Sequence, residues 1–411
     1  MNLLIFTEND HCGGLDSFIV NLVNNWPGHV TEDTITIICN NNHPGLEVIN
    51  SRVNKSCKII PHKLPILSRW TREKRKSSSP LGSILVKVQS IFLKYLFMIY
   101  QVRHLRRIFI QGGWTHLIVV NGGYPAGDSC RSASIAWKIA NKEKPSIHNF
   151  HNMAIKPRSI LLVPEMIVDN LVVWASKQIV TVSKVCSESM SNRSQIWKKL
   201  RPIYIYNGIE PRFRSTGPEK TNILKKRLNL PDSSQICLML GVYEERKGHR
   251  FLFEAFKTVA KKVPNAKLVI CGHGYPDEIN KVEQLKIKMG LEKQVILLNF
   301  TDDVDGMIRS SDVLLVGSQE FESFGLTIVE AMANKIPVVA TDVGGIPEVL
   351  MHGQGGFCCN RNDPEEFADK VIMLLKDEKS RKIIGDQGFE CFNVKFTAKV
   401  MANKYYKQLT T

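Results

Sequence analysis

Short apolar segments of strand length alternate with longer helical patterns along the whole of this chain of 411 residues. A continuous apolar run suits a strand that is buried on both faces, and helices between such strands make the sheet parallel. The pattern occurs as two sets. Strands are expected near residues 3–6, 34–38, 117–120, 146–150, 179–182 and 203–206, and then near 236–240, 268–271, 295–298, 313–316 and 338–340. We therefore predict an α/β fold with two doubly wound, Rossmann-like parallel-sheet domains.

A turn sequence separates the two sets of strands. Asn207-Gly208 followed by Pro211 is typical of a turn, and a new strand–helix series begins after it. We place an N-terminal domain at residues 1–206, a C-terminal domain at 207–390 and a last helix at 391–411 that could cross back to the N-terminal domain. Open parallel sheets bind ligands beyond the carboxyl ends of their strands, so two facing sheets predict an interdomain cleft.

Cysteine usage and hydropathy bear on the compartment. The ten cysteines include no CxxC pair and no spacing typical of zinc, which favours free thiols in a reducing cytoplasm. No run of eighteen uncharged apolar residues occurs, so we predict no transmembrane helix. The first residues lack the basic lead of a signal peptide. These features favour a cytoplasmic protein.

The net charge of +16 is concentrated in one stretch, because residues 51–110 hold 14 Lys and Arg and one acidic residue. Basic clusters within residues 69–107 flank an apolar helix pattern at 81–107 with a narrow polar stripe. This pattern suits docking on an anionic membrane surface, at the inner face of the cytoplasmic membrane. A core helix beside a basic surface loop is the open alternative. Nucleic acid is disfavoured, since aromatic residues are not interleaved with the basic clusters.

The segment between the strand at 313–316 and the next helix could bind an anion. Gly325 stands at the helix start, where free N–H groups attract phosphate and a glycine allows close approach. Glu322 precedes it, and Glu330 lies in the second helical turn. Carboxylates accept hydrogen bonds from hydroxyl groups, so phosphate flanked by hydroxyls indicates a nucleotide sugar. The simpler alternative is that both acids favour the helix dipole.

Other strand ends carry further candidates. Arg246 and Lys247 follow the strand at 236–240 and suit a pyrophosphate. Gly13-Gly14 opens a helix after the first strand. His151 falls at the carboxyl end of the strand at 146–150, whereas His148 is expected to be a core residue. The Asp302-Asp303 pair reads as a helix cap rather than a metal motif.

These residues together resemble the retaining glycosyltransferases of the GT-B fold, family four, also called glycosyl transferases group 1. The likeness covers nearly the whole chain and is strongest over residues 238–357. Its most specific element is the spacing of Glu322 and Glu330 within "ESFGLTIVEAMANKIPVVAT". The family often has an arginine where this chain has Val242.

The resemblance implies a role for each candidate. Glu322 and His151 would contact the donor sugar as catalytic residues. The donor would also be bound by Gly13, Gly14, Arg246, Lys247, the amides of Phe324, Gly325 and Leu326, and Glu330. No cofactor and no metal is expected, and the donor would be a UDP- or GDP-sugar. The acceptor would be a saccharide or a lipid-linked saccharide, in cell-surface polysaccharide or lipopolysaccharide biosynthesis. A non-catalytic sugar-nucleotide or polyanion-binding protein and a sugar-nucleotide epimerase are the alternatives.

Overall fold

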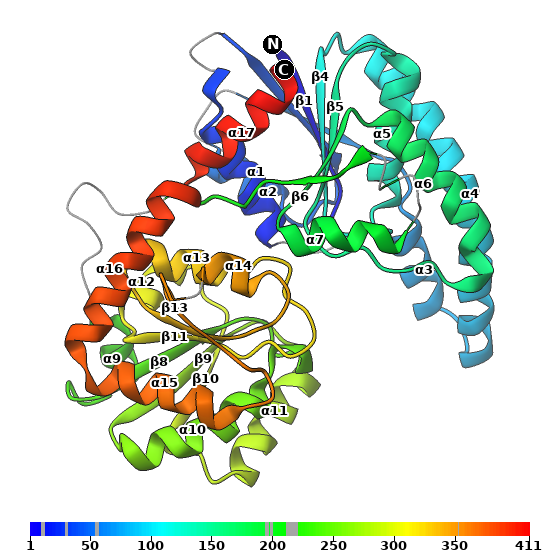
Figure 1. Cartoon of the computed structure of the whole chain (residues 1–411). Helices are drawn as coiled ribbons and strands as arrows, with labels where there is room; N and C mark the ends of the chain where they lie inside the picture. Colours follow the sequence, from blue (N-terminus) through cyan, green and yellow to red (C-terminus); the bar gives the residue numbers. More distant parts are fainter. Residues whose placement is uncertain are drawn as a thin grey trace. The chain divides into compact units, whose positions relative to one another are not determined.

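The chain divides into two compact units in the computed structural model, Met1–Tyr206 with Met401–Thr411, and Asn207–Val400 (Figure 1). The structure describes residues 1–9, 13–28, 32–53, 57–193, 197, 200–210, 221–351 and 353–411. Pro211 of the predicted turn lies outside these residues. The predicted interdomain cleft depends on how the two units are placed, and it stays a prediction.

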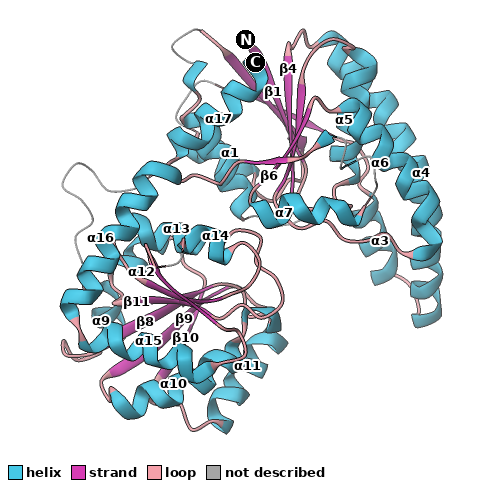
Figure 2. Ribbon diagram, viewed as in Figure 1, coloured by secondary structure: helices cyan, strands magenta, loops and turns pink. Residues whose placement is uncertain are grey.

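The first unit contains, in its described part, a seven-stranded parallel sheet in the order β3-β2-β1-β4-β5-β6-β7 (Figure 2). The strands are β1 Asn2–Thr7, β2 Thr34–Asn40, β3 Lys58–His62, β4 His116–Asn121, β5 Ser146–Phe150, β6 Gln178–Thr181 and β7 Ile203–Tyr204. The helices are α1 Gly14–Asn24, α2 Leu46–Arg52, α3 Leu67–Lys76, α4 Pro80–Gln111, α5 Asp128–Ala140, η2 Ser159–Leu161, α6 Leu162–Ala175, α7 Lys184–Ser189 and η3 Met190–Asn192.

The second unit contains a six-stranded parallel sheet among its described residues, in the order β10-β9-β8-β11-β12-β13. The strands are β8 Gln235–Leu240, β9 Ala266–Gly272, β10 Val295–Asn299, β11 Val313–Val316, β12 Val338–Thr341 and β13 Gly356–Cys359. The helices are α9 Ile223–Arg227, η4 Glu245–Lys247, α10 His249–Lys262, α11 Pro276–Lys288, α12 Val304–Arg309, α13 Leu326–Ala333, α14 Ile346–Leu350, α15 Pro364–Lys376, α16 Glu378–Lys395 and α17 Ala398–Thr410. The strand order reverses at β8 and β11, where open sheets bind ligands.

Every predicted strand has a counterpart, but two edge strands, β3 and β13, were not predicted. β3 contains Pro61, which a sheet tolerates at its edge because proline donates no ladder hydrogen bond. β13 is the short sequence Gly-Phe-Cys-Cys and lacks a continuous run of strongly apolar residues. Inner strands carry the clearer signal because both faces are buried. In β1, Leu3 and Ile5 enter one core and Leu4 and Phe6 the other.

The end of the chain belongs to the first unit. Residues 401–411 fall in that unit, so α17 begins in the second unit and ends in the first. The Tyr405 hydroxyl accepts a hydrogen bond of 2.6 Å from the Asn149 side chain, and its ring meets the edge of Phe18. Tyr406 makes an edge contact with Trp26. The C-terminal segment is therefore part of the core that covers one face of this sheet.

The helix α4 departs from two expectations. By length and composition it could cross a membrane, with a mean hydropathy of 1.5 in an 18-residue window, whereas no such helix was predicted. Lys87 and Lys94 broke the uncharged run on which that prediction relied. The alternative of a core helix is also wrong for this stretch, because 6% of the window is buried. Length and composition alone do not establish a span.

Candidate functional site

The loop after β11 turns into α13 at Gly325, whose φ of +90° lies in the left-handed region that favours glycine. Leu326 is the first helical residue, so its N–H and that of Gly325 have no acceptor within the helix. Phe324 is buried and meets the edge of Phe396 with ring centroids 6.0 Å apart. The predicted anion site thus has a left-handed turn at Gly325, two amides without an acceptor in the helix, and a buried Phe324 beside them.

A second glycine pair holds this loop in place. The N–H of Gly345 donates to the Glu322 carbonyl at 2.8 Å. Gly344 has a φ of +59°, and a Cβ added there would lie 2.1 Å from the same carbonyl oxygen. A side chain at this position would have to displace the backbone. The backbone of Glu322 is therefore positioned by a contact that needs glycine.

Lys247 and Glu322 form the central pair of the site. Lys247 Nζ donates to Glu322 Oε2 at 2.5 Å, and the Ser318 hydroxyl lies 3.5 Å from the same oxygen. Both charged side chains are 17% exposed. The pair forms because β8 and β11 are neighbours, and because Gly248 approaches Gly317 so closely that a Cβ would lie 1.8 Å from its carbonyl oxygen. A cation and a carboxylate thus stand together at adjacent strand ends.

Arg246 and Glu330 take different positions from this pair. The Arg246 guanidinium donates to Glu244 and lies 5.1 Å from the centroid of the Phe321 ring. It therefore contacts its own loop and the loop after β11. Glu330 is half-buried in the second turn of α13, as the sequence placed it. His273, which follows β9, stacks on Phe300, which follows β10, with the ring centroids 4.3 Å apart.

In the first unit, a carboxylate that sequence reasoning missed holds the Gly13-Gly14 turn. Asp16 accepts from the Gly13 N–H at 2.9 Å, and its other carboxylate oxygen lies 2.7 Å from Nε2 of His43. It is fully buried. An acid three residues after the residue that precedes a helix is a capping pattern, which could have identified it. Asp16 thus ties the turn after β1 to the loop after β2.

His151 follows β5 beside the helix that Gly14 begins. Its backbone N–H donates to the Asn121 carbonyl at 3.0 Å. Its ring makes an edge contact with Phe18, with the ring centroids 4.5 Å apart. Burial lowers the pKa of His151 to about 3, so the imidazole is neutral near neutral pH. Its Nε2 atom is buried with no hydrogen-bond partner in the described part of the chain. His148 is fully buried and stacks on Phe150, which confirms it as a core residue.

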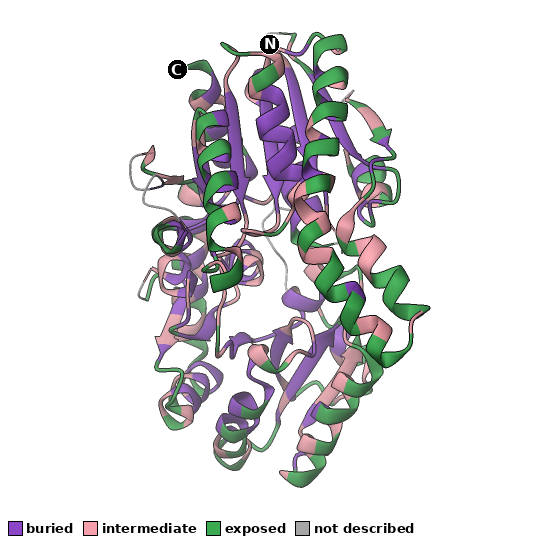
Figure 3. Cartoon of the chain, turned by 90° about the vertical axis from the view of Figure 1, so that its right-hand side faces the viewer, coloured by how far each residue is buried: buried purple, intermediate pink, exposed green. Residues whose placement is uncertain are grey.

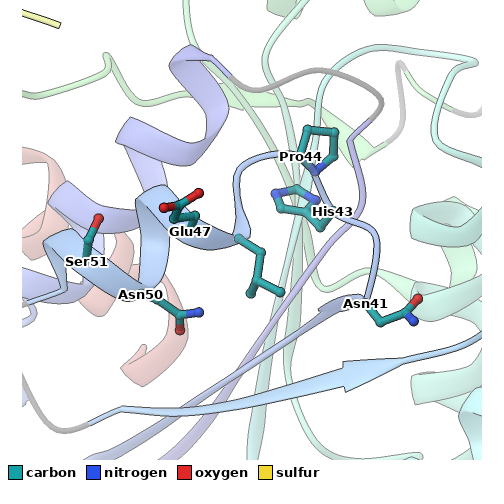
Figure 4. Close-up of a pocket in the computed structure, with 7 residues that line it drawn as sticks. Asn41, His43, Pro44, Glu47, Asn50 and Ser51 are labelled. Atoms are coloured by element: carbon teal, nitrogen blue, oxygen red, sulfur yellow. The ribbon is translucent and has the colours of Figure 1, made fainter.

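A cavity of about 540 Å³ lies beside the loop after β2 (Figure 4). Its walls come from this loop and from α2, and they are Asn41, His43, Pro44, Leu46, Glu47, Asn50 and Ser51. His43 is the partner of Asp16. None of the predicted site residues lines this cavity, so it is a separate hollow of the first unit.

The described residues contain no group of three His, Cys, Asp or Glu side chains that could hold a metal ion. The Asp302-Asp303 pair has the predicted structural role. The Asp303 side chain accepts from the Gly306 N–H at 2.9 Å and caps α12.

Known proteins are similar to this chain in sequence and in fold. N-acetyl-alpha-D-glucosaminyl L-malate synthase of Bacillus anthracis is 30% identical over 240 residues, which are 58% of this chain and 61% of that protein. D-inositol 3-phosphate glycosyltransferase of Corynebacterium jeikeium is 25% identical over 62% of this chain and 64% of its own. The first three curated relatives are matched over 54% to 61% of their length.

Solved structures support the fold over the whole chain. Anabaena HepE in complex with UDP and glucose has a TM-score of 0.75 and 16% identity, and all of both chains is covered. The lipopolysaccharide outer core galactosyltransferase WaaB has a TM-score of 0.66 and 15% identity over 99% of each chain. At these identities the likeness concerns the fold, and it confirms the GT-B class.

The family model described as Glycosyl transferases group 1 matches residues 220–390. This range contains Lys247, Glu322, the turn at Gly325 and Glu330. Residues 220–390 of this chain are therefore similar to the glycosyl transferases group 1 family.

Proposed function

We propose that the chain is a retaining, metal-independent glycosyltransferase that moves a sugar from a UDP- or GDP-sugar to a glycan or a lipid-linked saccharide. The observation that carries the proposal is the Lys247–Glu322 pair beside the first amides of α13, inside the segment that matches the family. A diphosphate needs a cation and N–H donors, and a sugar needs a carboxylate that accepts from its hydroxyls.

The charge development of the reaction gives these groups their roles. Breaking the bond between sugar and diphosphate builds positive charge on the sugar ring and negative charge on the leaving phosphate. Lys247, assisted by Arg246 and by the amides of 324–326, stabilises the phosphate without a metal. Glu322 positions the sugar. When the donor binds, its diphosphate replaces Glu322 as the partner of Lys247. Glu330 accepts from the ribose hydroxyls.

The first unit completes the proposed machinery. Gly13 and Gly14 approach the donor phosphate. The neutral imidazole of His151 lies beside the reacting sugar. The unpartnered Nε2 of His151 supports this role, because a buried polar atom without a partner is costly unless a ligand satisfies it. Retention of configuration follows the family likeness.

The donor and the acceptor classes rest on the relatives. HepE is described in complex with UDP and glucose, and WaaB as a lipopolysaccharide galactosyltransferase. We infer a nucleoside-diphosphate sugar donor and an acceptor in cell-surface polysaccharide or lipopolysaccharide biosynthesis. Residues 69–107 would bring the enzyme to the anionic inner face of the cytoplasmic membrane.

Calorimetric titration with UDP, GDP and ADP, with and without EDTA, tests the donor site. The wild-type protein is expected to bind one of the three diphosphates in preference to the others. EDTA is expected to leave that affinity unchanged. The Glu330→Ala variant loses this binding, because the ribose loses its carboxylate. Glu320→Ala is the matched control, since Glu320 is an exposed acid in the loop before Glu322.

Turnover then separates the proposal from its alternatives. Release of diphosphate from the matching nucleotide sugar in the presence of acceptor supports transfer. Binding without release indicates a non-catalytic binding protein, and an altered sugar nucleotide without acceptor indicates an epimerase. Absence of binding to all three diphosphates contradicts the donor site.

A further inference from the structure

The helix α6 buries its acidic residues and exposes large apolar ones, which is the opposite of a usual surface helix. Its acids Glu165 and Asp169 are buried, with exposed fractions of 2% and 1%. Val168 and Val172 also pack in the core, but most of its large apolar residues face outward, and Val163, Ile167 and Trp174 are each more than half exposed. Surface helices of soluble proteins place charges outward and apolar residues toward the core. With η2 before it, α6 exposes Ile160, Leu162, Val163, Met166, Ile167, Leu171 and Trp174.

Buried ion pairs hold α6 in this rotation. Glu165 accepts from Arg131 at 3.1 Å and from Arg193, and Asp169 accepts from Arg193 at 3.2 Å. Both guanidinium groups are fully buried. A buried charge needs its partners, so α6 cannot turn its apolar face inward without leaving charges unpaired. The exposure of the apolar face is therefore a built property of the fold.

The neighbouring helix α4 also exposes large apolar residues. Its buried residues are Val86, Met98, Gln101, Leu105 and Phe109, and Gln101 donates to the Pro65 carbonyl at 2.9 Å. Other apolar residues face outward, among them Leu81, Phe92 and Leu96, which are each more than 60% exposed. Of the polar stripe read from the sequence, Gln101 is buried and Lys94 is half-buried, whereas Lys87 is exposed. Figure 3 shows exposed and half-buried residues along much of this side.

One ion pair joins α4 to α6 at their partly buried sides. Lys94 of α4 donates to Glu165 of α6 at 2.7 Å, and the Tyr95 hydroxyl donates to the same oxygen at 3.2 Å. Both helices also contact α5, so they lie side by side on the first unit (Figure 1). We define the lipid platform as the exposed apolar residues of α4, η2 and α6.

The charge around the platform selects its occupant. The exposed basic residues at its margins include Lys74–Lys76, Arg103, Arg106 and Arg107 on α3 and α4, and Lys156 and Arg158 before η2. A second copy of this chain would bring these like charges together. An anionic bilayer offers both an apolar layer and negative headgroups. Because one face of α4 stays bonded to its own unit, the helix would lie in the interface rather than cross it.

We propose that the lipid platform inserts into the surface of an anionic bilayer, with α6 contributing as a second inserting helix beside α4. The choice of a membrane partner rests on the proposed function, since a lipid-linked acceptor would be reached there. The binding itself needs no turnover, so the two proposals fail separately.

Vesicle flotation with the full chain tests the platform. The full chain is expected to bind mixed phosphatidylcholine–phosphatidylglycerol vesicles. It is expected to bind vesicles of phosphatidylcholine alone only weakly. The Val163→Ser/Ile167→Ser variant lowers the partition coefficient at least about tenfold, because two apolar side chains no longer leave water. The matched control is Ile383→Ser/Val394→Ser, which removes two exposed apolar residues from α16 in the second unit. It leaves binding unchanged.

Trp174 reports insertion directly. It is 53% exposed on α6, so brominated acyl chains should quench its emission, and Trp174→Phe should remove that quenching. Failure to bind anionic vesicles overturns the proposal, as does binding that the α6 variant leaves intact. Sedimentation as a dimer that the same variant converts to a monomer would identify a second copy as the occupant and also overturns it. Diphosphate titration of the α6 variant shows that the donor site is retained.

Discussion

Two helices of similar length in the two units place their apolar residues in opposite directions. In α10 of the second unit, Phe251, Leu252 and Phe256 are buried, while Glu254 and Lys257 are exposed. In α6 of the first unit, Glu165 and Asp169 are buried beside Val168 and Val172, and most of the large apolar residues face outward. Both helices flank parallel sheets of the same kind. The sequence of a helix therefore predicts that one face is apolar. The buried partners of the helix decide whether that face points into the core or toward solvent.

The two units also divide the proposed work. The second unit holds the Lys247–Glu322 pair and the glycine contacts that position it. The first unit holds the lipid platform and its buried ion pairs. Changes in one unit are therefore expected to leave the other property intact.

The strongest test of this comparison is to remove the buried cation beneath α6. Arg131→Leu removes a partner of Asp128 and one of the three cations that pair with Glu165 among the described residues, and we expect the free energy of unfolding to fall by about 3 kcal/mol. Denaturant titration followed by tryptophan fluorescence measures it, since all six tryptophans lie in the first unit. A loss below about 1 kcal/mol would contradict the view that ion pairs hold α6 in its rotation.

The second test removes the cation of the donor site. Lys247→Met is expected to lower kcat about 10²–10³-fold, because the leaving phosphate loses a positioned positive charge. Vesicle binding should stay unchanged. Lys257→Met, which changes an exposed lysine on α10, is the matched control for activity. Equal activity of the two variants would remove Lys247 from the mechanism.

The third test uses acid to separate the units. Burial lowers the pKa of His62 to about 4 and of His148 and His151 to about 3, all in the first unit. In the described part of the second unit, a lowered histidine pKa is found at His249, about 4, from burial. Unfolded histidine titrates near 6.5, so the unfolded state binds more protons below that pH.

Stability is therefore lost as the pH falls from about 6.5 toward 4, by about 1.4 kcal/mol per pH unit for each such histidine. The first unit should unfold at the higher pH. Tryptophan emission reports this unit, and hydrogen exchange of β8 and β11 reports the other. Loss of protection in the second unit first would reverse the predicted order.

The fourth test compares two glycines of the second unit that both have positive φ. Gly344→Ala meets the Glu322 carbonyl and should cost about 1–3 kcal/mol, together with donor affinity. Gly290→Ala has φ +68° and no atom within 4 Å of the added Cβ, so it should cost about 1 kcal/mol and leave affinity alone. Thermal unfolding and diphosphate titration measure both. Equal costs would mean that the close approach of Gly344 has no energetic role.

The smallest effect is expected at a surface ion pair. Lys262 and Asp369 join α10 and α15 at 3.3 Å, but their side chains are 53% and 66% exposed. Lys262→Ala should change the unfolding free energy by less than about 0.5 kcal/mol, since solvent screens the pair. Denaturant titration beside Arg131→Leu gives the contrast. A larger loss would show that α10 also depends on its ion pairs.

The sequence by itself determined the inner strands, the parallel class of both sheets and the helix start at Gly325. These features follow from local patterns, since buried strands need continuous apolar runs and a left-handed turn favours glycine. The same patterns identified the acids and bases at the strand ends. They missed β3, β13 and the role of Asp16, because edge strands have weak patterns and His43 lies 27 residues from Asp16.

Only the tertiary structure decided which charges meet. Lys247 and Glu322 are 75 residues apart, and Glu165 meets Arg131 and Arg193 from distances of 34 and 28 residues. Sequence periodicity describes one helix at a time and contains no information on such partners. The rotation of α6 depends on its partners Arg131 and Arg193, since burying an ion without its partner costs more than exposing apolar surface.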